Sequence, residues 1–596
     1  MCKNLLFAFV LTAGLALSSC SKDVILEYLP EPFEEGNETT VVADDSAGET
    51  IDTDKDDDHV ANSTFDRTVQ VTFNGGSATV TGTTDDFTVT VSGAGVTITN
   101  KGEEAVIYEL SGSSSDGYFK LYSTRKQEIL LNGLTLTNQK GAAINNQSHK
   151  RTFVVVKGKN TLADGASYTQ TPEDEDEKAA FFSEGQLVFS GDGTLTVNAT
   201  GKAGITSDDY VRFLDAPVIK VTASAGHGVR GKEAVIVSDG TIDVNVSGTG
   251  KKGFSSDTLV YFGGGVTNIV TTGSAGEVDG ELTGVAGIKA DLRFEMVDGV
   301  LTITSSGKGA KGISGDNVAY FKGGTVTVNV TGENYGTSSG NGGGPGGGGG
   351  FGGFGGGGRP GWPGQGSTTE DNSVASKAVK FDGNLYVSGG KLTATSDHHE
   401  AIEAKGVLQV TGGEVYAFSS DDAINAGGDL TVEGGAVYAH SSGNDGLDAN
   451  GDLFIKGGVV YAVGSRSPEI AIDANSEKQK KLYLSGGTVI AVGGLESGAS
   501  LTQECWSAGT VKADTDYALY DDKGNVICTF KTPSVSNLTL VVSAPSLASA
   551  RSGVKVSGGT ACFDGLYRTG ATVSDGTECS LSAYSTGGGF NPGGGW

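Results

Sequence analysis

Beyond its first twenty residues the sequence lacks any hydrophobic run long enough to cross a membrane. It also lacks segments whose apolar residues recur at the 3.6-residue spacing of an α-helix. Basic residues are scarce, with 42 Lys and Arg against 71 Asp and Glu and a formal net charge of −29. Because nucleic-acid binding depends on clustered Lys and Arg, this balance argues against a nucleic-acid partner. We expect a helix-poor protein that attracts cations.

Cysteine is also rare, with six in 596 residues. Two lie in the first twenty residues, and the other four lie in the last hundred: Cys505, Cys528, Cys562 and Cys579. The spacing of these four does not match a zinc site. In an oxidising compartment they allow two disulfides in three possible pairings, and the sequence does not choose among them.

The N-terminus has the features of a bacterial lipoprotein signal peptide. Lys3 gives a small positive region, residues 5–17 form a short apolar run, and Leu17-Ser18-Ser19-Cys20 is typical of a lipobox. We predict that residues 1–19 are removed and that Cys20 is lipidated, which anchors the protein in the bacterial envelope at the outer membrane or cell surface. An ordinary secretory signal containing a cysteine is the alternative.

Residues 20–60 are predicted to form an acidic, disordered tether. They hold few large apolar side chains, and five of the seven residues 52–58 are acidic, so the segment cannot bury enough apolar surface to fold. Such a tether would hold the folded part of the protein away from the membrane.

Glycine, by contrast, is abundant, with 97 residues, and much of it recurs at regular positions. Gly390, Gly413, Gly435 and Gly458 follow one another at steps of 22 or 23 residues. Each repeat holds three short segments of alternating apolar residues separated by Gly, Asp or Asn. A single repeat cannot bury its apolar face, but stacked repeats can.

This pattern predicts an all-β protein built as a right-handed parallel β-helix with three strands per coil. Inward positions are predicted at Ile424, Val432 and Val437, and at the equivalent positions of the next coil. We assign residues 61–500 to this domain, interrupted by a glycine-rich loop at 336–366. Residues 501–596 are assigned to a β-rich C-terminal cap and a glycine-rich tail, since an open end would expose unpaired strands.

Stacking turns one sequence position into a column of side chains on successive coils. The first column consists of aromatic residues predicted to point outward: Tyr416, Tyr438 and Tyr461, with Phe418 and His440 two residues further along. Such a column suits stacking against sugar rings, or stacking of the rings on one another, and the sequence leaves both readings open.

The second column consists of oxygen-bearing side chains around the inward aliphatic residues: Glu400, Glu403, Asp421, Asp422, Asn425, Asn444, Asp445, Asp448 and Asp473. Carboxylates on successive coils repel one another unless they are protonated or bridged, and clusters of hard oxygen ligands suit Ca²⁺. We therefore predict calcium as a cofactor, with a solvated acidic face as the alternative. His398 and His399 are adjacent on one strand and point to opposite faces, so they are not predicted as joint ligands.

Several segments of this sequence resemble a known family when taken in order: residues 160–165, 204–209, 227–233, 420–426 and 444–449. The chain resembles the carbohydrate-binding β-helix proteins of bacterial cell surfaces, which are related in fold to pectate lyases. The resemblance implies binding of plant-type or acidic polysaccharides with associated calcium.

Two other functions are consistent with the same residues. A polysaccharide lyase would need calcium and a basic residue to remove a proton from the sugar, and Arg230, Lys289 and Lys380 are outward candidates. None of these lies in the predicted coils of the acidic column, where Lys405 is the one candidate exception, so the sequence favours binding over catalysis. A structural adhesin or surface spacer without a glycan site is the third possibility.

Overall fold

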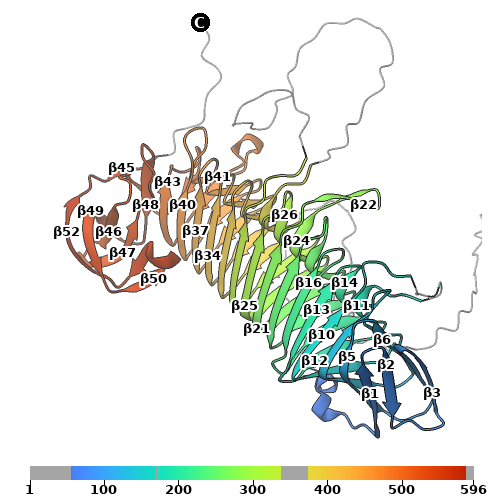
Figure 1. Cartoon of the computed structure of the whole chain (residues 1–596). Helices are drawn as coiled ribbons and strands as arrows, with labels where there is room; N and C mark the ends of the chain where they lie inside the picture. Colours follow the sequence, from blue (N-terminus) through green and yellow to red (C-terminus); the bar gives the residue numbers. More distant parts are fainter. Residues whose placement is uncertain (1–54, 170–171, 173–174, 337–372, 586–596) are drawn as a thin grey trace, which may run out of the picture.

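The protein is an elongated stack of short parallel strands in a computed structural model, which describes residues 55–169, 172, 175–336 and 373–585 (Figure 1). Its described part holds no α-helix and four 3-10 helices of three residues: η2 (Asp56–Asp58), η3 (Val60–Asn62), η4 (Ser476–Lys478) and η5 (Phe563–Gly565). None of these helices is long and apolar enough to cross a membrane. The predicted all-β parallel β-helix is confirmed.

One face of the stack is a sheet of 15 strands, which we call the 15-stranded sheet. Its strands, in spatial order, are β3 (Phe87–Ser92), β4 (Ala94–Asn100), β6 (Gly117–Ser123), β8 (Ile144–Asn146), β11 (Ala179–Ser183), β14 (Ala203–Ser207), β17 (Val229–Gly231), β20 (Lys252–Ser256), β24 (Val285–Ala290), β26 (Ala310–Gly315), β29 (Lys377–Phe381), β32 (Ile402–Ala404), β35 (Ile424–Ala426), β38 (Leu447–Ala449) and β41 (Ile472–Ala474).

Two further parallel ladders complete the coils. The second ladder contains β9 (Thr152–Lys157), β12 (Leu187–Ser190), β15 (Tyr210–Phe213), β18 (Ala234–Val237), β27 (Val318–Phe321), β30 (Leu385–Val387), β33 (Leu408–Val410), β36 (Leu430–Val432), β39 (Leu453–Ile455), β42 (Leu482–Leu484) and β44 (Ser500–Leu501). The third contains β10 (Lys159–Ala163), β13 (Thr194–Ala199), β16 (Val218–Ala223), β19 (Thr241–Val246), β28 (Thr325–Val330), β31 (Lys391–Ser396), β34 (Glu414–Ser419), β37 (Ala436–Ser441), β40 (Val459–Val463) and β43 (Thr488–Val492).

The number of strands per coil is not uniform. The second and third ladders are joined by long strands that span both positions: β5 (Val106–Ser114), β7 (Gln127–Thr137), β21 (Leu259–Thr271) and β25 (Arg293–Ser305). Where the chain turns more sharply, as between β35, β36 and β37, each repeat contributes one strand to each ladder. The predicted three strands per coil therefore do not describe the whole stack, and the handedness of the coil stays a prediction.

The regularly spaced glycines make the turn that precedes the third ladder. Gly413, Gly435 and Gly458 have φ values of 77°, 69° and 72°, a left-handed conformation that side chains rarely adopt. A Cβ on Gly435 would lie only 2.6 Å from the backbone carbon of Gly412 in the preceding coil. The glycine period thus marks turns that stack closely upon one another.

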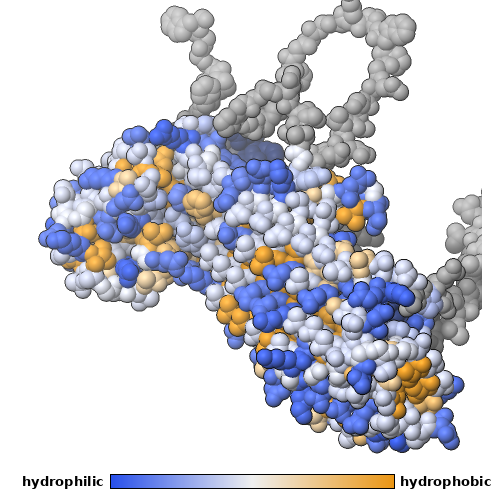
Figure 2. Space-filling model, in the orientation of Figure 1, coloured by the Kyte–Doolittle hydropathy of each residue, from blue (hydrophilic) through white to orange (hydrophobic). Residues whose placement is uncertain are grey.

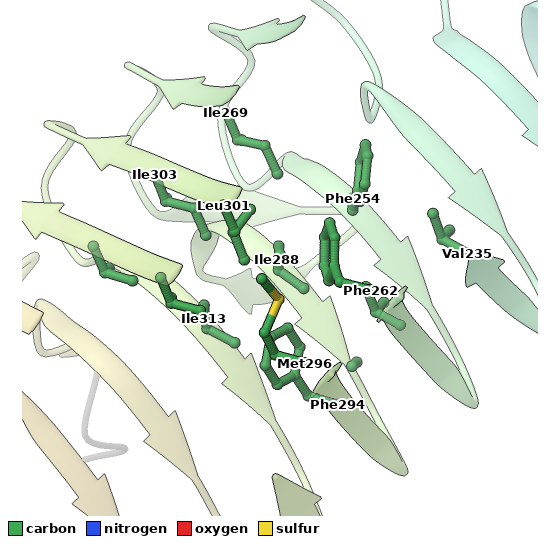
Figure 3. Close-up of a cluster of buried hydrophobic side chains, with 14 of the residues drawn as sticks. Val235, Phe254, Phe262, Ile269, Ile288, Phe294, Met296, Leu301, Ile303 and Ile313 are labelled. Atoms are coloured by element: carbon green, nitrogen blue, oxygen red, sulfur yellow. The ribbon is translucent and has the colours of Figure 1, made fainter. Parts of the chain in front are cut away.

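The core fills the inside of the coils (Figure 3). Phe213, Phe254 and Phe262 stack in series, with ring centroids 6.4 and 6.1 Å apart. The inward positions predicted from the repeat are buried: Ile424, Val432, Val437, Leu447, Ile455 and Val460 are each at most 1% exposed. The prediction of these inward columns is confirmed.

Both ends of the stack carry antiparallel strands. At the N-terminal end β1 (Arg67–Asn74) pairs antiparallel with β2 (Ser77–Thr81) and parallel with β5, so the parallel stacking begins at the first strand. The C-terminal region contains β45 (Trp506–Thr510), β46 (Asp516–Asp521), β47 (Val526–Lys531), β48 (Thr539–Ser543), β49 (Leu547–Ser557), β50 (Thr560–Cys562), β51 (Tyr567–Thr569), β52 (Thr572–Glu578) and β53 (Ser582–Ala583). Six of these strands form an antiparallel sheet, and β48 pairs antiparallel with β43 of the stack.

The four cysteines of the C-terminal region are free thiols in the structure. The predicted lipidation site Cys20, most of the predicted tether and nearly all of the glycine-rich loop lie outside the described residues. A small hairpin of β22 (Gly276–Val278) and β23 (Glu281–Thr283) projects from the stack before β24 (Figure 1).

The surface seen in Figure 2 is largely hydrophilic, with small apolar patches. The exposed valines of β21 and β25 include Val266, Val270 and Val300.

Candidate functional site

The outer face of the 15-stranded sheet changes from basic to acidic along the stack. One outward position on successive strands is occupied by Arg230, Ser255, Lys289, Ser314, Lys380, Glu403, Asn425, Asp448 and Asp473. Three residues earlier in each strand or its preceding turn stand Lys252, Ala286, Lys311, Lys377, Glu400, Asp422 and Asp445. A ligand lying along this face would meet positive charge on some coils and negative charge on others.

The basic and acidic halves meet at Lys377. Its Nζ lies 3.0 Å from Glu400 and 2.7 Å from Glu403. Lys380 also pairs in register with Glu403 of the next coil. The prediction that Lys380 lies away from the coils of the acidic column is therefore wrong, because its coil adjoins that of Glu403. Lys377 and Lys380 lie on β29, one repeat before Glu400 and Glu403, and pairing of β29 with β32 places the two coils next to one another.

The predicted acidic column is assembled as expected, and we call its nine members the acidic group: Glu400, Glu403, Asp421, Asp422, Asn425, Asn444, Asp445, Asp448 and Asp473. Amides link the coils, since Asn425 Nδ2 donates to Asp422 at 3.1 Å and to Asp448 at 2.8 Å. Backbone amides also contribute, and that of Ile470 donates to Asp445 at 2.6 Å. These bonds fix the carboxylates in position.

The first part of the acidic group lies beside Lys377 and His399. Burial alone would raise the pKa of Glu400, but its hydrogen bond with His399 and the charge of Lys377 lower that pKa to about 2. His399 Nδ1 also lies 3.1 Å from Asp421. The sequence reading set His399 aside because adjacent histidines face opposite ways. That argument excluded a pair of histidines but not one histidine beside two carboxylates.

The second part of the acidic group has no such partners among the described residues. Burial and the neighbouring carboxylates raise the pKa of Asp445 and of Asp448 to about 8, and the same causes raise that of Asp422 to about 7. Burial also raises the pKa of Asp473 to about 6. Within the described residues, none of these four carboxylates forms an ion pair with Lys, Arg or His. Their ionised forms are therefore unfavourable without a cation.

Three of these side chains could ligate a single ion. One ligand oxygen each from Asp445, Asp448 and Asp473 lies within 4.8 Å of the others. A hard-oxygen set of this kind fits Ca²⁺, which prefers carboxylate and carbonyl ligands.

Glu496 extends this set by one coil and was missed in the sequence. The bridge between Ile472 and Leu495 places Glu496 next to Asp473 in the outward column. It is 3% exposed, and neither of its oxygens makes a hydrogen bond of normal geometry in the described structure. Burial and the charge of Asp473 raise its pKa to about 7, although Ser476 partly offsets this. The sequence gives little indication that Glu496 belongs to the outward column, because the glycine repeat ends before this residue.

The predicted aromatic column does not face solvent. Tyr438 is 1% exposed and Tyr461 is fully buried, and both pack in a hydrophobic cluster with Phe530 and Phe563 of the C-terminal region. The Tyr461 hydroxyl donates to the backbone oxygen of Lys531 at 2.9 Å. The prediction of an exposed sugar-stacking column is thus wrong for these two tyrosines. They do point away from the coil interior, but the C-terminal strands cover them.

The rest of that column is partly accessible. Tyr416 stacks on Tyr438 at a centroid distance of 4.9 Å, and the Phe418 and His440 rings meet edge to face at 5.0 Å. Burial lowers the pKa of His440 to about 4, so the ring is neutral at pH 7. A role for Tyr416, Phe418 and His440 in sugar binding stays a prediction.

An aromatic pair outside the predicted column is more open. Phe454 and Tyr483 occupy one outward position on β39 and β42, with centroids 5.0 Å apart and planes 12° apart. Tyr483 is 36% exposed. The pair offers an aromatic surface of the kind on which a sugar ring stacks. It could have been found by following the second segment of each repeat as well as the third.

Comparison with known proteins agrees with a carbohydrate-binding protein. A curated relative from Acetivibrio thermocellus, described as a carbohydrate-binding domain-containing protein, is 33% identical over 127 residues, which is 20% of this chain and 43% of the relative. The match thus spans less than half of the relative's length. A solved structure of a polysaccharide lyase-like protein from C. thermocellum, a gadolinium derivative, covers 45% of this chain and 99% of its own at 21% identity, with a TM-score of 0.31. That score is too low to support an argument.

A family model extends over more of the chain. The model for carbohydrate-binding domain-containing proteins matches residues 92–423, which is more than half of the sequence. The matched stretch includes the basic half of the outer face and the start of the acidic group. This chain belongs to the family of carbohydrate-binding domain-containing proteins.

Proposed function

We propose that this protein binds a polysaccharide along the outer face of the 15-stranded sheet, with calcium held by Asp445, Asp448 and Asp473, while a lipid at Cys20 anchors it in the bacterial envelope. The observation that carries the calcium proposal is the set of three carboxylates within 4.8 Å that have no cationic partner among the described residues. A bound Ca²⁺ would remove their repulsion and keep open positions for sugar hydroxyl or carboxylate oxygens.

The test is a glycan array probed with calcium and with chelator. We expect plant-type or acidic polysaccharides to be retained in calcium and to lose at least about tenfold in affinity on chelation, which corresponds to about 1.4 kcal/mol. The isosteric double substitution Asp445→Asn with Asp448→Asn should remove this calcium effect. Asp522→Asn, an exposed change in the C-terminal region, serves as the matched control.

The outcomes separate the parts of this proposal. Equal glycan binding with and without calcium would contradict the calcium site but leave polysaccharide binding intact. An array without any retained glycan would contradict polysaccharide binding itself. Lys377 and Lys380 lie beside the acidic group, so a lyase is the second candidate; release of unsaturated sugar products that absorb in the ultraviolet would favour it.

The anchor is tested separately. Cys20→Ala should prevent cleavage of the signal peptide before residue 20. It should also abolish lipid attachment at this residue and reduce the share of the protein in the membrane fraction. Metabolic labelling with a fatty-acid probe, followed by membrane fractionation, measures both effects. Unchanged labelling in the variant would contradict lipidation at Cys20.

A further inference from the structure

A small pocket opens on the basic half of the same face, between β20, β24, β26 and β29. It has a volume of about 190 Å³ and is lined by Lys252, Lys289, Lys311 and Lys380, with Asp316 as the one acidic residue in its lining. This volume is well above the ~10–15 Å³ that a single water requires. The pocket therefore has room for a small polar group of a ligand.

The positive charge of this pocket is only partly compensated. Lys289 pairs with Asp316 and lies 3.1 Å from Asp291, and Lys380 lies 2.5 Å from Asp382. Lys252 donates to the backbone oxygen of Gly250 at 2.8 Å. Across the described residues, neither Lys252 nor Lys311 forms an ion pair with a carboxylate.

The two uncompensated lysines also lie in less solvated surroundings than a surface lysine. Burial lowers the pKa of Lys311 to about 8, and the charges of Lys380 and Lys377 act in the same direction. Burial and the charges of Lys251 and Lys289 lower the pKa of Lys252 to about 8 as well. An anion in the pocket would relieve this repulsion, as a carboxylate does beside Lys289.

Register places the two lysines on either side of a small residue. Lys252, Ala286 and Lys311 occupy the same position on three successive strands. Successive strands lie roughly 4.8 Å apart, so an anion above Ala286 would be about equally close to both ammonium groups. The Ala286 methyl leaves that space open, and Ser314 lines the same pocket with a hydroxyl group.

We propose that this pocket binds an anionic group of the polysaccharide, either the carboxylate of a uronic acid residue or a sulfate ester. This inference rests on the proposed function and adds to it the place on the outer face where an anionic group of the glycan is bound. A polyanionic chain lying along the outer face would contact the lysines directly, and it would reach the acidic group of the later coils only through a bridging cation.

The experiment uses the full chain with the double substitution Lys252→Ala and Lys311→Ala, assayed in chelator so that calcium does not contribute. The probes are polygalacturonate, its fully methyl-esterified form, dextran sulfate and dextran. Polygalacturonate is compared with its methyl ester, and dextran sulfate with dextran. Wild-type protein should bind at least one anionic glycan at least tenfold more tightly than its neutral counterpart, and salt should weaken that binding. The double variant should lose this preference and keep its affinity for the neutral glycans.

Two controls keep the outcome interpretable. Lys523→Ala removes an exposed lysine of the C-terminal region and should change nothing. Lys252→Gln with Lys311→Gln retains more of the side-chain volume and should reproduce the loss, and both double variants should be at least as thermally stable as wild type in the absence of anions. Preference for polygalacturonate alone indicates a uronate, and preference for dextran sulfate alone indicates a sulfate ester.

Failure of this inference is distinct from failure of the proposed function. If wild type binds neutral and anionic glycans equally, or if the double variants keep the preference, the anion pocket is wrong while polysaccharide binding stands. If no glycan binds, but free galacturonate or sulfate raises the melting temperature of wild type and not of the double variants, the pocket stands and polysaccharide binding is wrong. Absence of both effects would overturn both.

Discussion

Without calcium, the protein is expected to lose stability steadily as the pH rises from about 4 to about 8. Asp445 and Asp448 have a pKa of about 8 in the folded state because burial and neighbouring carboxylates disfavour their ionised forms. The pKa values of Asp422 and Asp473 in the folded state are also above the usual value. In the unfolded chain these groups titrate near 3.9, so over this pH range the folded state binds more protons than the unfolded state.

The sign of the effect follows from proton linkage. Each proton that the folded state retains and the unfolded state releases lowers the free energy of unfolding by about 1.4 kcal/mol per pH unit. The four carboxyls interact, so the protons leave in shared steps rather than one residue at a time. Glu400 acts in the opposite direction, because its folded pKa of about 2 contributes stability that is lost only as the pH falls below about 4. The stability optimum in chelator is therefore expected between pH 4 and 5.

Calcium should reverse this trend. An ion bound only by the folded state, at a hundredfold excess over its dissociation constant, adds about 2.7 kcal/mol. Since the ion competes with protons for the same oxygens, the increase in melting temperature on adding calcium should be small at pH 5 and large at pH 8. Thermal unfolding at both pH values, in calcium and in chelator, measures the difference.

A neutral isostere provides the decisive variant. Asp448→Asn should raise the melting temperature in chelator at pH 8, because it removes a buried charge that has no cationic partner, and it should diminish the response to calcium. Asp522→Asn should change neither. A calcium response that is equal at pH 5 and pH 8, or that survives in Asp448→Asn, would contradict the proposed ligand set.

The second large effect is expected at the N-terminal edge of the described structure. Residues 55–65 lie against the second ladder, where Asp58 is 2% exposed and forms ion pairs with Arg151 at 2.9 Å and with Arg212 at 2.8 Å. Phe65 meets Phe153 edge to face at 6.2 Å. We call this segment the N-terminal strap. Asp58→Ala would remove the shared carboxylate beneath it, and breaking a buried ion pair in this way costs about 3–5 kcal/mol.

In Asp58→Ala the strap is expected to undock before the stack unfolds. Its release returns Arg151 and Arg212 to water, which limits the loss in the free energy of unfolding of the stack. Hydrogen exchange should show loss of protection in residues 55–65 and at Arg212, together with a lower melting temperature. Asp57→Ala is the matched control, because its carboxylate is 88% exposed and lies 3.8 Å from Arg151. Unchanged protection in Asp58→Ala would show that the strap is held by its apolar contacts alone.

The strap departs from the predicted tether at its last residues. Residues 52–58 were read as part of a solvated tether because the run is acidic, yet Asp58 is buried. The sequence carries no local sign of this, since the partners Arg151 and Arg212 lie roughly a hundred residues or more away. Charge patterning describes the average surroundings of a segment, whereas burial of one carboxylate depends on what packs over it.

The repeat of short alternating segments and regularly spaced glycines was enough to establish the parallel β-helix, its inward columns and the vertical alignment of the acidic group. These features follow from short-range physics: the period of two in a strand, the glycine that a left-handed turn requires, and the repetition that aligns equal positions on adjacent coils. Only the tertiary structure decided which outward columns remain open. It placed the C-terminal strands over Tyr438 and Tyr461, paired Lys377 with Glu400 and Glu403 on the adjoining coil, and added Glu496 beyond the end of the repeat. A repeat defines which way a side chain points from its own coil, but contacts with segments outside the repeat determine whether that side chain meets water, a counter-charge or a packed surface.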